Sequence, residues 1–147
     1  QKNFQNTFLL IMLDKDIKQL LSNSKNVALI GISLDSKKPS NFVMKYLLDS
    51  GYNVYPINPI HEGKKVHNQI ILKNLDQLNS EIDILNIFRP SAECGLIVKE
   101  SLKKNPKNIW LQLGIQNQEA KDLSIQQNIP YIENKCILVE HRRLIDV

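Results

Sequence analysis

The sequence predicts an α/β protein built on a doubly wound parallel sheet of five strands. Two observations support this prediction. Short apolar runs alternate with amphipathic stretches along the chain, and the first run, residues 27–30, ends at Gly31. Continuous apolar runs are typical of strands that helices cover on both faces. Parallel neighbours also need a helical crossover between them, which the amphipathic stretches would supply.

The first two strands are marked by clear stop signals. The run at 27–30 is followed by Gly31, and the second strand, at 52–57, is closed by Asn58 and Pro59. The remaining predicted strands are short apolar segments at residues 82–88, 109–113 and 131–132.

The predicted helices show apolar residues at helical spacing. The first covers 14–21, with Asp14 as its expected cap. The second covers 39–48, where Pro39 and Ser40 begin the helix and Gly51 ends it. The later helices are expected at residues 90–104, 117–128 and 136–144. Between the second and third strands, a polar loop at 61–68 precedes a short segment at 70–78.

Length and composition indicate a single globular domain. The chain has 147 residues, of which 42% are hydrophobic and 23% charged, and it contains no apolar run long enough to cross a bilayer. We expect residues 1–24 to form an arm and a short helix, and residues 25–147 to form the domain. Cys94 and Cys136 fit neither a disulfide framework nor a zinc site, which favours a reducing cytoplasm.

The basic residues are scattered rather than gathered. The formal net charge is +4, and no basic stripe with interleaved aromatic residues occurs, so nucleic acid is not an expected partner. An even spread of this kind suits a smaller anionic ligand. The sequence leaves open whether the chain forms a homo-oligomer or binds another protein.

The carboxyl ends of the predicted strands combine groups that favour phosphate. Right-handed crossovers place these ends along one edge of the sheet, where ligands of such folds bind. Gly31 begins a small polar turn that contains Ser33 and leads to the helix start at Ser40. Lys38 immediately precedes that helix, and Arg89 follows the third predicted strand. Backbone N–H groups at a helix start, with cations beside them, attract phosphate groups.

Two common phosphate motifs are absent. The G-x-G-x-x-G spacing of dinucleotide-binding proteins does not follow Gly31, and Asn58 and Pro59 stand where an acidic residue would bind the ribose. The chain also lacks the G-x-x-x-x-G-K-[ST] loop of nucleotide triphosphatases. These absences argue against NAD and against a P-loop, although NADP held by Lys and Arg remains an alternative.

Five segments resemble one known family when they are taken in order. They read VALIGIS, KPSNFVMKYLLDSGYNVYPINP, DILNIFRP, IWLQLGI and NKCILVEHRRL, and together they span most of residues 26–144. This pattern is similar to that of small stand-alone CoA-binding proteins with a Rossmann-type domain, which are related to the CoA-binding domain of the succinyl-CoA synthetase alpha subunit. The resemblance implies a Rossmann-like CoA-binding fold with coenzyme A, or an acyl-CoA, bound across the strand edge.

The resemblance also implies a set of binding residues. Those after the first strand and at the first crossover helix would lie by the phosphates, those after the third strand by the adenine, and those after the fourth along the pantetheine. The implied residues are Gly31, Ser33, Ser36, Lys38, Pro39, Ser40, Asn58, Pro59, Phe88, Arg89, Gln112, Leu113 and Gly114. The family often has a lysine just after the second-strand turn. Here Ile60 and His61 follow instead, so Lys64 or Lys65 would have to replace it.

Three functional hypotheses follow. The first is a CoA-binding carrier or sensor without catalysis of its own. The second is an acyl-CoA-handling enzyme that uses Cys136 or His141, or a subunit of a CoA ligase; because the chain ends at Val147, such a ligase would need a partner chain for its other domains. The third is the NADP-type domain. No catalytic residue and no metal site is predicted.

Two side-chain groups have both a chemical and a structural interpretation. Cys136, Glu140 and His141 would be a nucleophile with a base if their segment is helical, but they equally fit a packed thiol beside a Glu140–Arg142 or Glu140–Arg143 network. His61 and His67 lie in one loop with Glu62. The two histidines lack a third ligand at a spacing typical of metal sites, so the sequence does not favour a metal there.

Overall fold

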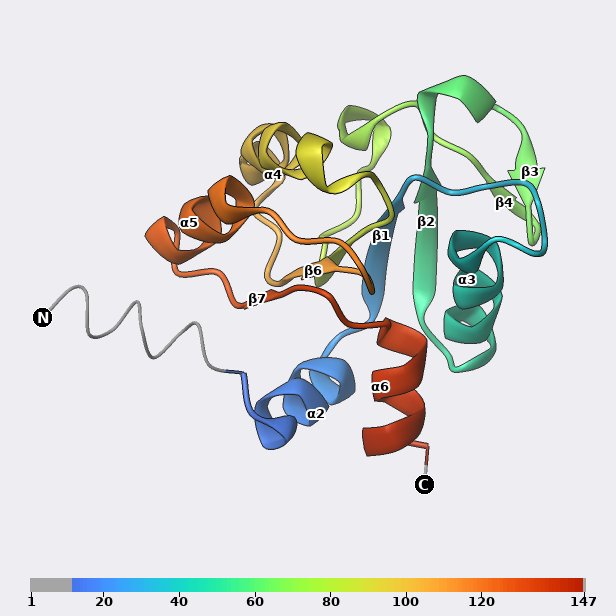
Figure 1. Cartoon of the computed structure of the whole chain (residues 1–147). Helices are drawn as coiled ribbons and strands as arrows, with labels where there is room; N and C mark the ends of the chain where they lie inside the picture. The colour runs from blue at the N-terminus through green and yellow to red at the C-terminus, as the bar shows by residue number, and fades with distance from the viewer. Residues whose placement is uncertain (1–11, 147) are drawn as a thin grey trace, which may run out of the picture.

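A parallel sheet of five strands runs through the middle of the molecule (Figure 1). In this computed structural model, which describes residues 12–146, the strand order is β2-β1-β5-β6-β7 and every pairing in the sheet is parallel. The strands are β1 (Asn26–Ile30), β2 (Asn53–Ile57), β5 (Ile84–Ile87), β6 (Ile109–Leu111) and β7 (Tyr131–Ile132). The predicted five-stranded sheet is thus confirmed, and the strand ends shift by at most two residues.

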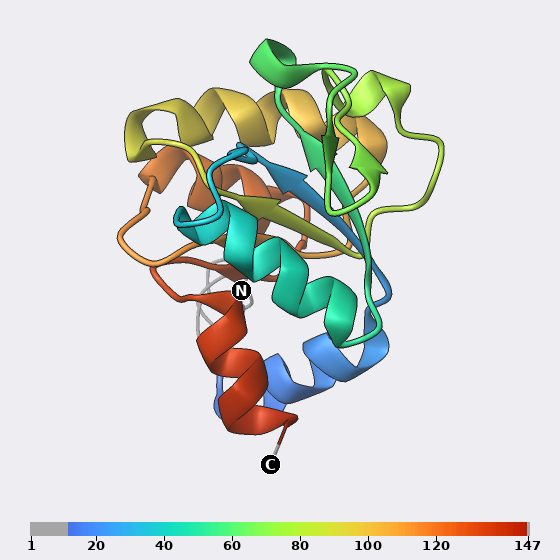
Figure 2. The same ribbon diagram turned by 90° about the vertical axis from the view of Figure 1, so that its right-hand side faces the viewer.

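Helices cover both faces of the sheet, as a doubly wound fold requires. Helices α4 (Cys94–Ser101) and α5 (Gln118–Gln126) lie on one face, and α2 (Asp14–Asn23), α3 (Pro39–Asp49) and α6 (Ile137–Leu144) lie on the other (Figures 1 and 2). Side chains of β1 alternate between the two cores: Val27 and Leu29 pack under α2, α3 and α6, whereas Ala28 packs under α4 and α5. Helices therefore cover both faces of the sheet and exclude water from them, which explains the continuous apolar runs in the sequence.

Helix α2 begins at Asp14 as predicted, but its capping residue differs from the prediction. Leu13 is the residue before the first turn, and its N–H donates to Asp16 Oδ2 at 3.1 Å. Asp14 is already helical, so it cannot cap the helix, and its carboxylate instead accepts two hydrogen bonds of 2.8 Å from Arg143 of α6. The predicted arm covers residues 1–13, of which residues 1–11 lie outside the described residues. The proposed boundary at residue 24 stays a prediction.

The predicted polar loop at 61–68 contains ordered structure. Between the short 3-10 turns Pro59–His61 and Leu75–Gln77, a small antiparallel hairpin pairs β3 (Lys65–Val66) with β4 (Gln69–Ile70). His67 and Asn68 form its turn with φ of 47° and 64°. A two-residue turn with positive φ at both positions usually contains Asn-Gly or Asp-Gly, so the His-Asn pair gave no clear hairpin signal.

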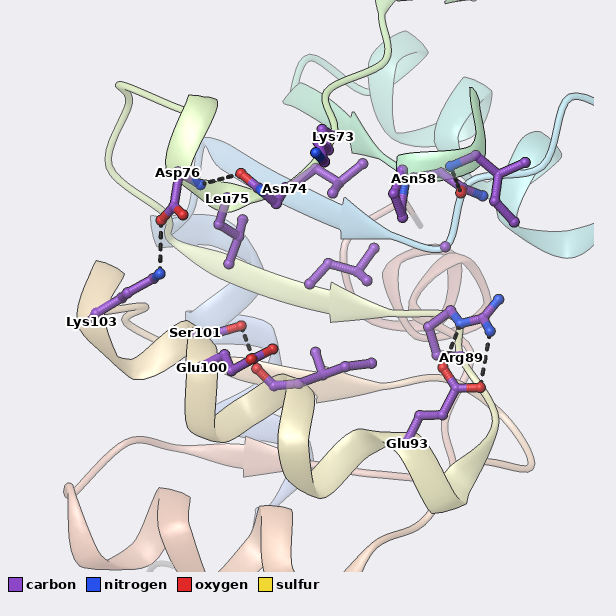
Figure 3. A pocket seen from close by; sticks show the side chains of 16 residues that line it. Asn58, Lys73, Asn74, Leu75, Asp76, Arg89, Glu93, Glu100, Ser101 and Lys103 are labelled. Atoms are coloured by element: carbon purple, nitrogen blue, oxygen red, sulfur yellow. Dashed lines mark hydrogen bonds and ion pairs between the residues drawn. The ribbon is translucent and has the colours of Figure 1, made fainter. Parts of the chain in front are cut away.

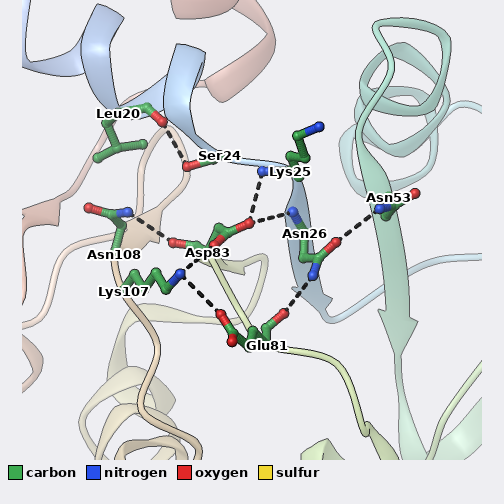
Figure 4. A network of polar contacts seen from close by, with 9 residues as sticks. All are labelled: Leu20, Ser24, Lys25, Asn26, Asn53, Glu81, Asp83, Lys107 and Asn108. Atoms are coloured by element: carbon green, nitrogen blue, oxygen red, sulfur yellow. Dashed lines mark hydrogen bonds and ion pairs between the residues drawn. The ribbon is translucent and has the colours of Figure 1, made fainter.

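The amino-terminal edge of the sheet is held by polar contacts around Asp83 (Figure 4). Its Oδ2 accepts hydrogen bonds from the N–H groups of Lys25 and Asn26, at 2.9 and 2.8 Å. Burial by itself would raise the pKa of Asp83, but these donors together with Lys107 bring it below its ordinary value. The network aligns the starts of β1 and β5 at the end of the sheet opposite the predicted site.

Helix α6 packs on α3 through a buried histidine. The Nδ1 atom of His141 lies 2.8 Å from the hydroxyl oxygen of Tyr46, and the His141 ring meets the Tyr46 and Tyr52 rings edge to face. Glu140 is also buried and accepts a 2.7 Å hydrogen bond from Arg143. The structure therefore contains the Glu140–Arg143 network that the sequence allowed.

This packing predicts a loss of stability in mild acid. Burial lowers the pKa of His141 from its ordinary value of 6.5, so below that pH the unfolded chain binds a proton more strongly than the folded one. The contribution of His141 to stability is complete above about pH 6.5 and declines as the pH falls toward the lower pKa of the folded state. Urea unfolding from pH 8 to pH 5 should show this decline.

The matched variant is His141→Phe, which keeps an aromatic ring but cannot titrate. Its unfolding free energy should fall less steeply between pH 7 and pH 5 than that of the wild type. Equal slopes for the two proteins would show that His141 does not contribute to the acid sensitivity.

Candidate functional site

The strand order reverses at β1, which has β2 on one side and β5 on the other. Gly31 follows β1 at this point with a φ of 96°, and its N–H donates to the carbonyl oxygen of Ile57 at 2.9 Å. A Cβ atom at Gly31 would collide with the carbonyl oxygen of Phe88 and would lie 3.0 Å from Cδ of Arg89. The backbones after β1 and β5 can therefore approach this closely only because residue 31 is glycine.

The loop after Gly31 is fastened to the first turn of α3. The N–H of Ser33 donates to Ser40 Oγ at 2.9 Å, and Nδ2 of Asn41 donates to the carbonyl oxygen of Ser33 at 2.8 Å. Ser33 Oγ in turn accepts from the N–H of Asp35 at 3.1 Å. Ser40 and Asn41 are buried. The path of the loop from residue 31 to residue 36 is thus set by α3. We call these residues the phosphate loop because the sequence predicts phosphate binding there.

The amino terminus of α3 is available to an anion. Lys38 precedes the helix without a side-chain capping bond, Pro39 is its first residue, and its first turn contains no acidic residue. Pro39 has no N–H, and the N–H groups of Asn41 and Phe42 donate to the carbonyl oxygen of Lys38. The N–H of Ser40 and the helix dipole therefore give this end its partial positive charge, which no acidic residue of the first turn offsets. Lys37, Lys38 and Ser36 are exposed beside it.

The β3–β4 hairpin braces this arrangement through His67. Its Nε2 atom lies 2.8 Å from Asn41 Oδ1 and 3.1 Å from the carbonyl oxygen of Asn41. Both partners are acceptors, because Nδ2 of Asn41 is used on Ser33. The hydrogen of a neutral His67 therefore resides on Nε2. His67, which belongs to the segment predicted as a polar loop, thus helps to hold the phosphate loop in place.

A groove of about 430 Å³ opens next to Gly31, within the usual size range of small-molecule sites (Figure 3). It lies on the α4 face of the sheet, between α4 and the segment that follows β4. The residues that line it are Ile30, Gly31, Ile57, Asn58, Pro59, Ile60, Lys73, Asn74, Leu75, Asp76, Arg89, Glu93, Ile97, Glu100, Ser101 and Lys103.

The charges along this groove are balanced and partly paired. Arg89 donates to both carboxylate oxygens of Glu93 at 3.0 and 2.9 Å, and Lys103 lies 2.9 Å from Asp76. The Lys103 ammonium beside Asp76 holds the pKa of that carboxyl below its usual value. Lys73 has no ion-pair partner within residues 12–146.

The residues that the sequence singled out fall into distinct groups. Gly31, Asn58, Pro59 and Arg89 line the groove. The phosphate loop and the start of α3 contain Ser33, Ser36, Lys38, Pro39 and Ser40. Asn58 joins the two regions, because its Nδ2 donates to the carbonyl oxygen of Ile32 at 2.9 Å while its Oδ1 accepts from the N–H of Ile60 at 3.0 Å.

The other predicted residues lie apart from the groove. Phe88 packs against the core under α3 and α6, on the opposite face of the sheet. Gln112 is 2% exposed; its Oε1 accepts from the N–H of Ile137 at 3.0 Å and its Nε2 donates to Oδ1 of buried Asn86. Leu113 is exposed, and the N–H of Gly114 donates to Asn134 Oδ1 at 2.7 Å. The role of these four residues in binding stays a prediction.

The groove contains a lysine that sequence reasoning did not find. Neither Lys64 nor Lys65 lines it, whereas Lys73 does. Leu72 forms a single parallel bridge with Ile57, so the chain continues past the end of β2 and brings Lys73 and Asn74 to the groove. The apolar run at 70–72 was the available signal, but one bridging residue is too short to be recognised as a strand.

The two side chains that could act as a base for Cys136 have structural partners. Glu140 bonds to Arg143 and His141 to Tyr46, so both possible bases for Cys136 have other partners. Within residues 12–146, no three His, Cys, Asp or Glu side chains gather in a way that would hold a metal ion. None of the helices in the same range has the length and apolar character needed to cross a membrane.

A parallel sheet with a glycine turn and an uncapped helix start at its switch point defines a nucleotide-binding protein of the α/β class. Comparison with known proteins identifies the family. Residues 25–142 match the model of the CoA binding domain, and the chain belongs to this family.

Similar proteins extend over nearly the whole chain. The uncharacterized protein YneT of Bacillus subtilis is 34% identical over 127 residues, which cover 86% of this chain and 92% of YneT. A solved structure from Thermus thermophilus, cell-free ID.343, is 33% identical with a TM-score of 0.88 and covers 91% of this chain and 100% of its own. An acetyl-coenzyme A synthetase of Ca. Korarchaeum cryptofilum shares the fold alone: at 21% identity and a TM-score of 0.64, the match covers 79% of this chain and 27% of the synthetase.

Proposed function

We propose that this protein binds coenzyme A or an acyl-CoA at the carboxyl edge of its sheet and acts as a carrier or sensor without catalysing a reaction. The observation that carries the proposal is that the start of α3 and the groove meet at the Gly31 turn. The uncapped start of α3 lies beside the Gly31 turn, and the same turn lines the groove. A ligand with an anionic centre and a flat heterocyclic end would use both.

The diphosphate of coenzyme A would occupy the phosphate loop. There it would accept hydrogen bonds from backbone N–H groups near the start of α3 and from the guanidinium of Arg89. The adenosine end would extend into the groove over its apolar floor of Ile30 and Ile57. Lys73, which has no ion-pair partner among residues 12–146, would bind a further phosphate. The pantetheine arm would leave in the other direction, along the strand ends.

The non-catalytic role is supported by the surroundings of the thiol. Cys136 is a free cysteine, but Glu140 and His141 are buried and bonded to other side chains. General-base activation of a thiol requires such a group within hydrogen-bond reach. Because Cys94 is also free, we further propose that the protein works in a reducing compartment, the cytoplasm.

Calorimetry and thermal unfolding with coenzyme A, acetyl-CoA, NAD and NADP test the proposal. Free coenzyme A at 100 times its dissociation constant should stabilise the fold by about 2.7 kcal/mol. Stabilisation by NADP but not by coenzyme A would reject CoA binding in favour of another nucleotide. Hydrolysis or transfer of an acetyl-CoA thioester that disappears in Cys136→Ala would reject the non-catalytic role.

Arg89→Ala should weaken CoA binding about ten- to a hundredfold, because a hydrogen bond between charged groups contributes roughly 1.5–3 kcal/mol. The matched control is Lys45→Ala, which removes a cation from an exposed pair with Asp49 on α3, outside the groove. The control should bind coenzyme A as the wild type does. Equal affinities of Arg89→Ala and wild type would place the diphosphate elsewhere.

A further inference from the structure

The guanidinium of Arg89 is occupied by a carboxylate at the mouth of the groove. Nε of Arg89 donates to Glu93 Oε1 at 3.0 Å and Nη2 donates to Oε2 at 2.9 Å (Figure 3). A guanidinium offers this forked edge to carboxylates and phosphates alike. Glu93 therefore fills the part of Arg89 that a phosphate would bind best.

The two ends of this ion pair are not held equally. The aliphatic part of Arg89 lies against the Gly31 turn, where a Cβ at residue 31 would come within 3.0 Å of its Cδ, so this end of the pair has a second contact. Glu93 belongs to a short 3-10 turn, Ser91–Glu93, and its side chain has no hydrogen-bond donor other than Arg89 within residues 12–146. Because the side chains of Arg89 and Glu93 are 41% and 46% exposed, Glu93 can turn toward solvent without disturbing the core.

Release of Glu93 costs little, whereas its presence opposes an anion. Exposed ion pairs are weak, since water screens both charges, and even the forked geometry of this pair leaves it far weaker than a buried one. A diphosphate brings more negative charge than one carboxylate and can displace it. A neutral ligand has no charge with which to displace Glu93. If Glu93 stayed beside Arg89 while a nucleotide bound, its carboxylate would repel the phosphates of that nucleotide.

We infer that Glu93 is an internal competitor for Arg89, which the diphosphate of the ligand must displace, so that Glu93 lowers the affinity for phosphate-bearing nucleotides and leaves the affinity for neutral ones unchanged. This inference rests on the proposed function, because it takes Arg89 to bind the diphosphate. Glu93 would then limit how strongly the groove prefers phosphate-bearing ligands to neutral ones.

Glu93→Gln tests the inference, since glutamine keeps the shape of the side chain without its charge. By calorimetry, the variant should bind coenzyme A and ADP roughly two- to fivefold more tightly than the wild type, the range expected for loss of one exposed ion pair. Its affinity for adenosine, which has no phosphate, should not change. In an Arg89→Ala background, Glu93→Gln should no longer strengthen binding.

Asp49→Asn is the matched control. It removes the same charge from another pair at the same spacing, Lys45–Asp49, which also has a 2.9 Å contact and lies outside the groove. Salt at physiological strength screens such a distant charge, so this variant should bind coenzyme A as the wild type does.

The outcomes separate this inference from the proposed function. If the wild type binds coenzyme A and Glu93→Gln binds it equally or more weakly, Glu93 orients Arg89 and is no competitor, while the proposed function stands. An equal gain in Asp49→Asn would also reject a specific role for Glu93. If neither wild type nor variant binds coenzyme A, both the inference and the proposed function are wrong.

Discussion

Gly31→Ala should abolish measurable CoA binding and destabilise the fold by about 3 kcal/mol. Any non-glycine residue pays roughly 1–2 kcal/mol for a positive φ, and here the new Cβ also meets the carbonyl oxygen of Phe88. The backbone must shift to relieve that contact. Because the same peptide units shape the phosphate loop, we expect affinity to fall at least a hundredfold, measured by calorimetry at a temperature where the variant is folded.

Gly51→Ala separates backbone conformation from the close approach. Gly51 has nearly the same φ, 99°, but a Cβ there would meet nothing within 4 Å. This variant should lose only about 1 kcal/mol of stability and keep its CoA affinity. If both variants lost the same stability, the contact with Phe88 would be unimportant. Full CoA binding by Gly31→Ala would remove the turn from the site.

The parts of the site that lie at strand ends were predictable from sequence. Gly31, Asn58 and Arg89 follow apolar runs, and parallel topology gathers the ends of such runs at one edge whatever the details of packing. The fold class was predictable for the same reason, because the apolar periodicity reports which segments are covered on both faces. Element boundaries were less certain, as the end of α2 at Asn23, two residues beyond the predicted end, shows.

Residues whose roles depend on distant contacts were not predictable. Asn41 looks like an ordinary polar residue of a helix, yet it is buried between Ser33 and His67, which is 26 positions away. Lys73 reaches the groove only because Leu72 forms one bridge with Ile57. A sequence pattern contains neither contact. The hairpin and the bridge both come from tertiary packing, and so does this side of the groove.

Gln112 was predicted to contact the ligand because it follows a strand. In the structure its side chain instead connects two elements of the fold. Its side chain is buried and joins two elements, accepting from the N–H of Ile137 at the start of α6 and donating to Asn86 on β5. The Nδ2 atom of Asn86 is buried without a hydrogen-bond partner among residues 12–146, so Asn86 already has one unpaired donor, and losing the bond at its Oδ1 would leave a second unpaired group.

Gln112→Met should therefore destabilise the fold by about 3 kcal/mol. Methionine resembles glutamine in length, but the variant leaves the N–H of Ile137 and Oδ1 of Asn86 buried and unpaired, at roughly 1–3 kcal/mol each. Urea unfolding measures the loss. Adding Asn86→Leu removes one stranded group, so the double variant should be more stable than the sum of the two single changes predicts.

The same variant decides whether Gln112 also contacts the ligand. A residue that only supports the fold should leave CoA affinity nearly unchanged once binding is measured well below the unfolding temperature. A tenfold loss of CoA affinity in Gln112→Met, with the binding of 3′-phospho-ADP unaffected, would instead assign Gln112 to the pantetheine arm, because 3′-phospho-ADP is coenzyme A without that arm. Additive stability changes in the double variant would show that Gln112 and Asn86 are not coupled.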